Sequence, residues 1–178
     1  MLRGTEVIKA INQREKIILQ HICHPIPPFF DDDSKILILG SFPSVKSREQ
    51  GFFYGHPQNR FWKVIAGVFE KNVPQTIEEK KALLKECGVA VWDVIASCEI
   101  LGSSDSSIKN VTANDISGII KTAEIRMIIT NGRTAEKYYN KYIGNKITVP
   151  SLCLPSTSPA NDKKSLQALI EEWKIIKS

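Results

Sequence analysis

Four short apolar runs alternate with longer helical patterns along this chain, and this alternation limits the possible folds more than any other feature. The runs are rich in Ile, Val and Leu and span residues 35–40, 89–94, 125–130 and 147–153. Such runs are typical of strands that are buried on both faces of a sheet. Helical patterns separate them over residues 59–71, 77–86, 113–122, 132–143 and 162–176. We therefore predict an α/β protein, a three-layer α/β/α sandwich around a mainly parallel four-stranded sheet.

The chain has the length and apolar content of one globular domain. Its 178 residues are 42% apolar, which is enough for a sizeable core, so we expect a single domain over residues 1–178. Residues 1–30 are predicted to form an N-terminal helix at 5–20 and an extension, because apolar residues there recur at near-helical spacing before a Pro-rich stretch. The Gly- and Ser-rich stretch at 98–112 is expected to be a long functional loop.

Composition narrows the setting in which the protein works. No apolar run approaches the roughly 18 to 20 residues that span a bilayer, and the first residues lack the layout of a signal peptide, so we expect a cytoplasmic protein without membrane contacts. The formal charge of +5 is compatible with a polyanionic partner.

The cysteines and histidines give little sign of a metal site. Four cysteines lie far apart, and we interpret them as reduced structural thiols: Cys23, Cys87, Cys98 and Cys153. His21 and His24 lie on either side of Cys23, but no matching ligands occur elsewhere, so we predict no metal.

Four loops follow the predicted strands and would meet at one edge of a parallel sheet, where α/β proteins bind ligands. They span residues 40–59, 93–107, 130–134 and 154–161. Their side chains are mainly hydroxyls, amides and aromatic rings, with few acids. Hydroxyls and backbone N–H groups suit phosphates, and rings suit a stacked base, so a nucleic acid fits this edge better than a small acid does.

Motifs in these loops resemble the uracil-DNA glycosylase superfamily, most closely its hypoxanthine-DNA (deoxyinosine) glycosylase branch. The first motif reads G-S-F-P-S at 40–44 and the second reads L-P-S-T-S at 154–158. The string G-F-F-Y-G-H-P-Q-N-R-F-W at 51–62 is also similar to the mismatch-specific uracil glycosylases. The resemblance spans roughly residues 33–175 and implies a monofunctional enzyme that hydrolyses the N-glycosidic bond of hypoxanthine in DNA after base flipping, which initiates base excision repair.

The resemblance also implies roles for individual residues. Several relatives carry Asp or Asn in the first motif and His in the second, where this chain has Phe42 and Leu154. The hypoxanthine branch is similar in lacking that first-motif group and relies on an Asn in the N-R-F-W string, which implies that Asn59 is catalytic and holds the water or the sugar. Tyr54 would stack on the flipped base. Asp93 occupies the base-reading position, where a carboxylate could accept from the N1–H of hypoxanthine.

Further candidates lie around these three residues. Ser41, Phe42 and Asn131 are predicted to contact the base. The candidates for contacts with the DNA strand are Ser44, Ser156, Thr157, Ser158 and Pro159, of which Thr157 or Pro159 could enter the space that the base leaves. The basic residues that could reach phosphates are Lys46, Arg48, Arg60, Lys109 and Arg133.

Each role has a purely structural alternative. Asp93 could cap a helix or fix the 98–107 loop, and Tyr54 could be a core aromatic residue, as we expect for Phe52 and Phe53. Asn59 could cap the helix that begins at Arg60. Asn131 and the Ser residues of the second motif could simply form turns.

The partner that follows from the resemblance is DNA containing deaminated bases, bound by a nucleoid-associated monomer without a cofactor. We predict no metal cluster, because the cysteines lack close paired spacing. Two other functions stay open. The first is a mismatch-specific uracil or thymine glycosylase, since uracil presents a comparable N3–H and O4 pair. The second is a catalytically silent module that binds damaged DNA.

Overall fold

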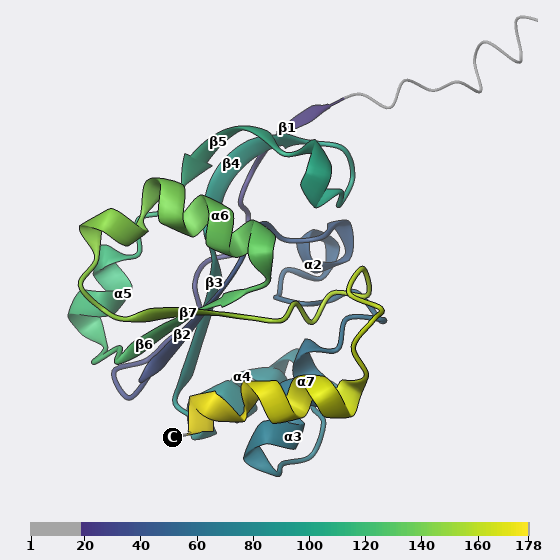
Figure 1. The fold of residues 1–178 in the computed structure, drawn as a ribbon, viewed down its shortest axis with the longest axis vertical. Coiled ribbons are helices and arrows are strands. Elements are labelled where there is room, and N and C mark those ends of the chain that lie inside the picture. Colours follow the sequence, from purple (N-terminus) through teal and green to yellow (C-terminus); the bar gives the residue numbers. More distant parts are fainter. Residues whose placement is uncertain (1–18, 178) are drawn as a thin grey trace, which may run out of the picture.

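The computed structural model describes residues 19–177, so the helix predicted at 5–20 lies almost wholly outside the described residues. The described chain forms three layers, a parallel four-stranded sheet between two layers of helices, as predicted (Figure 1). The strand order is β3-β2-β6-β7. The strands are β2 (Ile36–Gly40), β3 (Val89–Asp93), β6 (Met127–Asn131) and β7 (Ser151–Leu154). Each begins inside its predicted run and ends within one residue of the predicted end.

Helices cover both faces of this sheet (Figure 1). One face packs against α3 (Phe61–Phe69), α4 (Ile77–Glu86) and α7 (Leu166–Trp173), and the other against α5 (Ser117–Thr122) and α6 (Arg133–Tyr142). Alternate residues of β2 enter the two cores: Ile38 lies in the first, and Leu37 and Leu39 lie in the second. This double burial explains why the strands are continuously apolar.

Capping side chains set where several helices begin. Thr76 accepts from the backbone N–H of Glu79 and completes a capping box, so α4 begins at Ile77 as predicted. Ser165 accepts from the N–H of Ala168, so α7 begins at Leu166 and not at 162. A 3₁₀ turn, Lys174–Lys177, follows α7.

A second, antiparallel sheet occupies much of the stretch that we predicted to be a loop. Its strands are β1 (Gln20–Cys23), β4 (Ile95–Ile100) and β5 (Lys109–Ala113), in the order β1-β4-β5. The predicted loop at 98–112 was therefore wrong in part, because only residues 101–108 connect strands, with a 3₁₀ turn at Asp105–Ser107. β5 also takes the first residue assigned to the helix at 113–122. A short helix, α2 (Val45–Gln50), was not predicted.

The ends of the parallel strands meet at one edge of the sheet. Gly40 pairs in register with Asp93, and Asn131 pairs with Leu154. The four loops predicted to converge therefore do converge. None of the helices within residues 19–177 combines the length and apolarity needed to cross a lipid bilayer.

The four cysteines are free thiols. Burial raises the pKa of the Cys87 and Cys98 thiols to about 11, which favours the protonated form. Cys23 is exposed at the end of β1, which is unusual for the structural thiol that we expected there.

Candidate functional site

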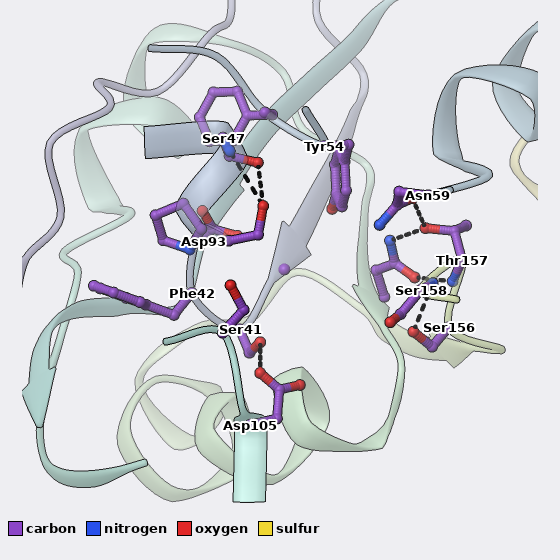
Figure 2. A pocket seen from close by; sticks show the side chains of 16 residues that line it. Ser41, Phe42, Ser47, Tyr54, Asn59, Asp93, Asp105, Ser156, Thr157 and Ser158 are labelled. Carbon is purple, nitrogen blue, oxygen red and sulfur yellow. Dashed lines mark hydrogen bonds between the residues drawn. The ribbon is translucent and has the colours of Figure 1, made fainter. Parts of the chain in front are cut away.

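A cavity of about 130 Å³ opens where the four loops meet. Its volume is below the roughly 300–1,000 Å³ of pockets that enclose drug-sized ligands, so it suits one flat ring system whose attached groups stay outside. The wall includes ten predicted residues: Ser41, Phe42, Ser44, Tyr54, Asn59, Asp93, Asn131, Ser156, Thr157 and Ser158. Figure 2 shows Asn59 and Thr157 on one side of Tyr54, with Asp93 and Phe42 on the other.

Tyr54 presents an aromatic ring at the pocket wall. One face of this ring is stacked on Phe61, with 3.8 Å between the ring centroids and 17° between the planes. The backbone of Tyr54 has a φ of 53°, which is uncommon for a residue with a side chain and typical of functional sites. Its hydroxyl is buried beside the Asn131 side chain. Burial, with a further contribution from the charge of Asp93, raises the pKa of this hydroxyl, which stays protonated.

A directional chain of hydrogen bonds fixes the orientation of Asn59. The backbone N–H of Thr157 donates to Asn131 Oδ1 at 3.0 Å, so the Asn131 nitrogen must be the atom that donates to Thr157 Oγ1 at 2.9 Å. The Thr157 hydroxyl then donates to Asn59 Oδ1 at 3.0 Å. The N–H of Phe61, the first residue of α3, donates to the same oxygen at 2.9 Å, so Asn59 bonds to the start of the helix although the N-cap position is Arg60 and not Asn59.

The consequence for Asn59 is that its oxygen is committed and its nitrogen is not. Among the described residues, the hydrogen bonds of the Asn59 side chain all use Oδ1. The two N–H groups of Nδ2 are the part of the amide left for the pocket. Asn59 can therefore donate to a bound molecule, but it cannot accept a proton from water.

Several predicted DNA contacts turn out to support the site from within. The residue Thr157 is 0% exposed, so it cannot be the wedge that enters DNA, and it instead orients Asn59. Asn131 uses both its oxygen and its nitrogen on Thr157. Ser156 and Ser158 accept from nearby backbone N–H groups and so form turns, although both also line the pocket. Pro159 is exposed.

Two of the five predicted phosphate-binding residues point inward, which corrects that prediction. The guanidinium of Arg60 donates to the backbone carbonyls of Ser158, Asn161 and Lys164 and so holds the second motif in place. Arg48 donates to the carbonyl of Pro43 at 2.7 Å. The remaining three, Lys46, Lys109 and Arg133, are exposed.

Asp93 is paired with a residue that sequence reasoning did not select. His24 Nε2 lies 2.7 Å from Asp93 Oδ2, and the two side chains are only 3% and 6% exposed. The backbone also approaches this carboxylate, since a Cβ at Gly40 would lie 2.2 Å from Asp93 Oδ1. His24 and Asp93 are 69 positions apart in the sequence, so no local sequence signal indicates the pairing.

Asp105 was also missed as a candidate. Ser41 Oγ donates to Asp105 Oδ1 at 3.1 Å, so the first motif and the turn after β4 meet at the pocket (Figure 2). Ser103 Oγ accepts from the N–H of Val45 at 2.9 Å and strengthens this junction. Asp105 is exposed as a whole, but its carboxylate lies against the pocket wall. Loss of water there raises the pKa of this carboxylate.

The sequence model of the Uracil DNA glycosylase superfamily matches residues 27–177. The chain belongs to this superfamily, as its motifs predicted. Two curated relatives are each named Hypoxanthine DNA glycosylase. The one from Methanosarcina acetivorans is 34% identical over 84% of this chain and 94% of its own length. The one from Methanosarcina barkeri is 30% identical over 83% of this chain and 92% of its own length.

The fold has a close match among solved structures. The solution NMR structure of a candidate uracil DNA glycosylase from Methanosarcina acetivorans superposes with a TM-score of 0.72. The two proteins are 31% identical, and the match covers 86% of this chain and 97% of the other.

Proposed function

We propose that this protein is a monofunctional DNA glycosylase that releases hypoxanthine from deoxyinosine in DNA and acts as a monomer on the nucleoid. The observation that carries the proposal is the orientation of Asn59, whose amide N–H groups are left for the pocket by the bonds to Thr157 and Phe61. The names and coverage of the two Methanosarcina relatives support the substrate.

The pocket would hold a purine that has been flipped out of the duplex. The face of Tyr54 opposite Phe61 is the one left for stacking on the base. Asp93 Oδ1 would accept from N1–H of hypoxanthine. Adenine has a bare N1, so the same carboxylate would face a second acceptor and reject it.

Asn59 would act on the departing base. Cleavage passes through an oxocarbenium-like sugar, and negative charge develops on the purine as the N9–C1′ bond breaks. The Nδ2–H groups of Asn59 can donate to the purine in that state. We first expected Asn59 to hold the water or the sugar. Its N–H groups could donate to either, but they cannot take the proton of the nucleophile, so we assign them to the departing base.

Asp105 would act as the general base for the attacking water, from a different wall of the pocket. Of the two carboxylates that line the pocket, Asp93 is paired with His24, which leaves Asp105 as the proton acceptor. The water oxygen would bond to C1′, the electrons of the N9–C1′ bond would leave with the base, and the water proton would pass to Asp105. Ser41 holds this carboxylate in place.

The flanking strand would run over the second motif and the exposed basic residues. Ser44, Ser156, Ser158 and Pro159 stay candidates for strand contacts, with the first three at the pocket wall. Lys46, Lys109 and Arg133 have exposed side chains that could neutralise phosphates.

The test is an excision assay on matched duplexes that contain inosine, uracil, xanthine or a mispaired thymine. We expect free hypoxanthine and an abasic site from the inosine duplex, at the highest rate of the four. Tight binding to inosine without base release would instead support the silent binding module. Faster release of uracil or thymine would support the mismatch-directed alternative.

A further inference from the structure

The His24–Asp93 pair is enclosed by aromatic side chains, and Asp93 lines the pocket. His24 is 5.7 Å from Phe42 and 6.3 Å from Trp92, measured between ring centroids, and both contacts are edge-to-face. The backbone N–H of His24 donates to the carbonyl of Ala96 at 2.7 Å and fixes the chain after β1. The imidazole is therefore held against Asp93 by packing on several sides.

The tautomer of His24 follows from its second contact. The backbone N–H of Ile26 points at His24 Nδ1 at 3.2 Å, so Nδ1 must carry a lone pair. The proton of the neutral ring then lies on Nε2, which donates to Asp93 Oδ2 at 2.7 Å. His24 is a donor to Asp93, and in this tautomer it cannot become an acceptor.

The N–H donor at His24 Nε2 determines which atom of residue 93 faces the pocket. The oxygen beside Nε2 is committed to His24, and the other carboxylate oxygen is the atom that comes within 2.2 Å of a Cβ built on Gly40, at the pocket. A carboxylate presents an acceptor on both sides. An amide at the same position would have to turn its oxygen to His24 and its NH₂ to the pocket, and so would present a donor.

We propose that His24 is a positioning residue that sets the hydrogen-bond polarity of Asp93, so that the pocket offers an acceptor to bases with a ring N–H. This inference rests on the base-reading role of Asp93 in the proposed function. It assigns part of the specificity to a residue that precedes the segment matched by the superfamily, which begins at residue 27.

The test compares single-turnover excision of hypoxanthine by variants of both residues. Asp93→Asn should slow excision by about tenfold to hundredfold, because the introduced amide turns a donor toward N1–H. His24→Gln should keep most of the activity, since the Gln amide can also donate to Asp93. The double variant His24→Gln/Asp93→Asn should be faster than Asp93→Asn alone, because the Gln can flip, accept from the introduced amide and free its oxygen for N1–H.

The rescue separates positioning from simple support of the fold. A residue that only stabilises the structure would make the double variant no better than Asp93→Asn. Unchanged excision by Asp93→Asn would overturn the base-reading role itself, and with it this proposal. A slow Asp93→Asn without rescue, in a double variant whose melting temperature matches that of Asp93→Asn, would overturn only the role of His24.

Nitrogen-15 NMR of the wild-type protein tests the geometry without any variant. The chain has three histidines, so the His24 signals can be assigned by comparison with His21→Gln and His56→Gln. We expect a protonated Nε2 and an unprotonated Nδ1 at neutral pH. The opposite tautomer, with the ring proton on Nδ1 and an unprotonated Nε2, would contradict the proposal even if a variant failed to fold.

Discussion

The hydroxyl of Thr157 donates a 3.0 Å hydrogen bond to the side-chain oxygen of Asn59, across 98 residues of sequence. This bond joins the second motif to the N-R-F-W string and decides which end of the Asn59 amide faces the pocket. Asn59 therefore bonds to the first N–H of α3 with its oxygen and faces the pocket with its nitrogen. The structural and functional interpretations of this residue, which we kept as alternatives, are both compatible with one geometry.

Removing the Thr157 hydroxyl should loosen Asn59. In Thr157→Val the shape is kept, but the Asn131 nitrogen loses a buried acceptor, which costs about 1–3 kcal/mol of unfolding free energy. Excision should fall as well, because the Asn59 amide is free to rotate. Urea unfolding and single-turnover excision measure the two effects. Thr157→Ser keeps the hydroxyl and is the control, and an equal loss in both variants would contradict this role.

Gly40 is required by the close approach of Asp93. A Cβ at this position would lie 2.2 Å from Asp93 Oδ1 and 3.3 Å from the Tyr54 hydroxyl oxygen, so Gly40→Ala should displace the carboxylate and abolish detectable excision. Gly118→Ala is the matched control, since nothing lies within 4 Å of its added Cβ and Ala is favoured in a helix. Wild-type excision by Gly40→Ala would show that the carboxylate is not used.

Arg60 and Arg133 should differ in how they affect the salt dependence of DNA binding. Arg60→Met removes donors to three backbone carbonyls and should lower stability and excision, yet leave the salt slope unchanged. Arg133→Ala should reduce the magnitude of the slope of log K against log[salt] by about 0.9 for one lost phosphate contact. Fluorescence anisotropy across a salt series measures both. A reduced slope in Arg60→Met would restore the phosphate role that we first assigned to it.

The pH–rate profile of excision should have an acidic limb that reports protonation of Asp105. Its raised pKa means that the base form is lost on acidification at a pH above the ordinary Asp value of about 3.9, so the wild-type rate should fall there as pH decreases. Asp105→Asn should slow excision by about 10²–10⁴-fold and remove this limb. Asp32→Asn changes an exposed carboxylate outside the pocket wall and should have no effect. An acidic limb that survives in Asp105→Asn would assign it to another group.

The sequence allowed the parallel sheet to be predicted because its strands are buried on both faces and therefore read as continuous apolar runs. The antiparallel sheet escaped prediction because β5 is polar and largely exposed, with the pattern Lys-Asn-Val-Thr-Ala. Ser and Gly residues around it also resemble a loop. In addition, β1 pairs with β4 although the two strands are far apart along the chain, and backbone pairing of that kind leaves little trace in composition.

Site residues that lie in a sequence motif could be predicted. Those whose role depends only on the orientation of the side chain in the fold could not. Tyr54, Asn59 and Asp93 do line one pocket, as predicted. Arg60 was misjudged because a basic residue beside a motif looks like a phosphate ligand. Only the structure shows that its guanidinium donates to the carbonyls of Ser158, in the second motif, and of Asn161 just after it. His24 and Asp105 reach the site through contacts between distant elements, which no local pattern reports.

The most direct test of the account is single-turnover release of hypoxanthine from an inosine duplex by wild type and by Asn59→Asp. The aspartate keeps an oxygen for Phe61 N–H and Thr157 Oγ1 and suits a helix N-terminus, so the fold and melting temperature should be retained. It replaces the pocket N–H donors with an acceptor. We predict efficient release by wild type and a loss of at least about a hundredfold in Asn59→Asp. Release at the wild-type rate by Asn59→Asp would contradict the account.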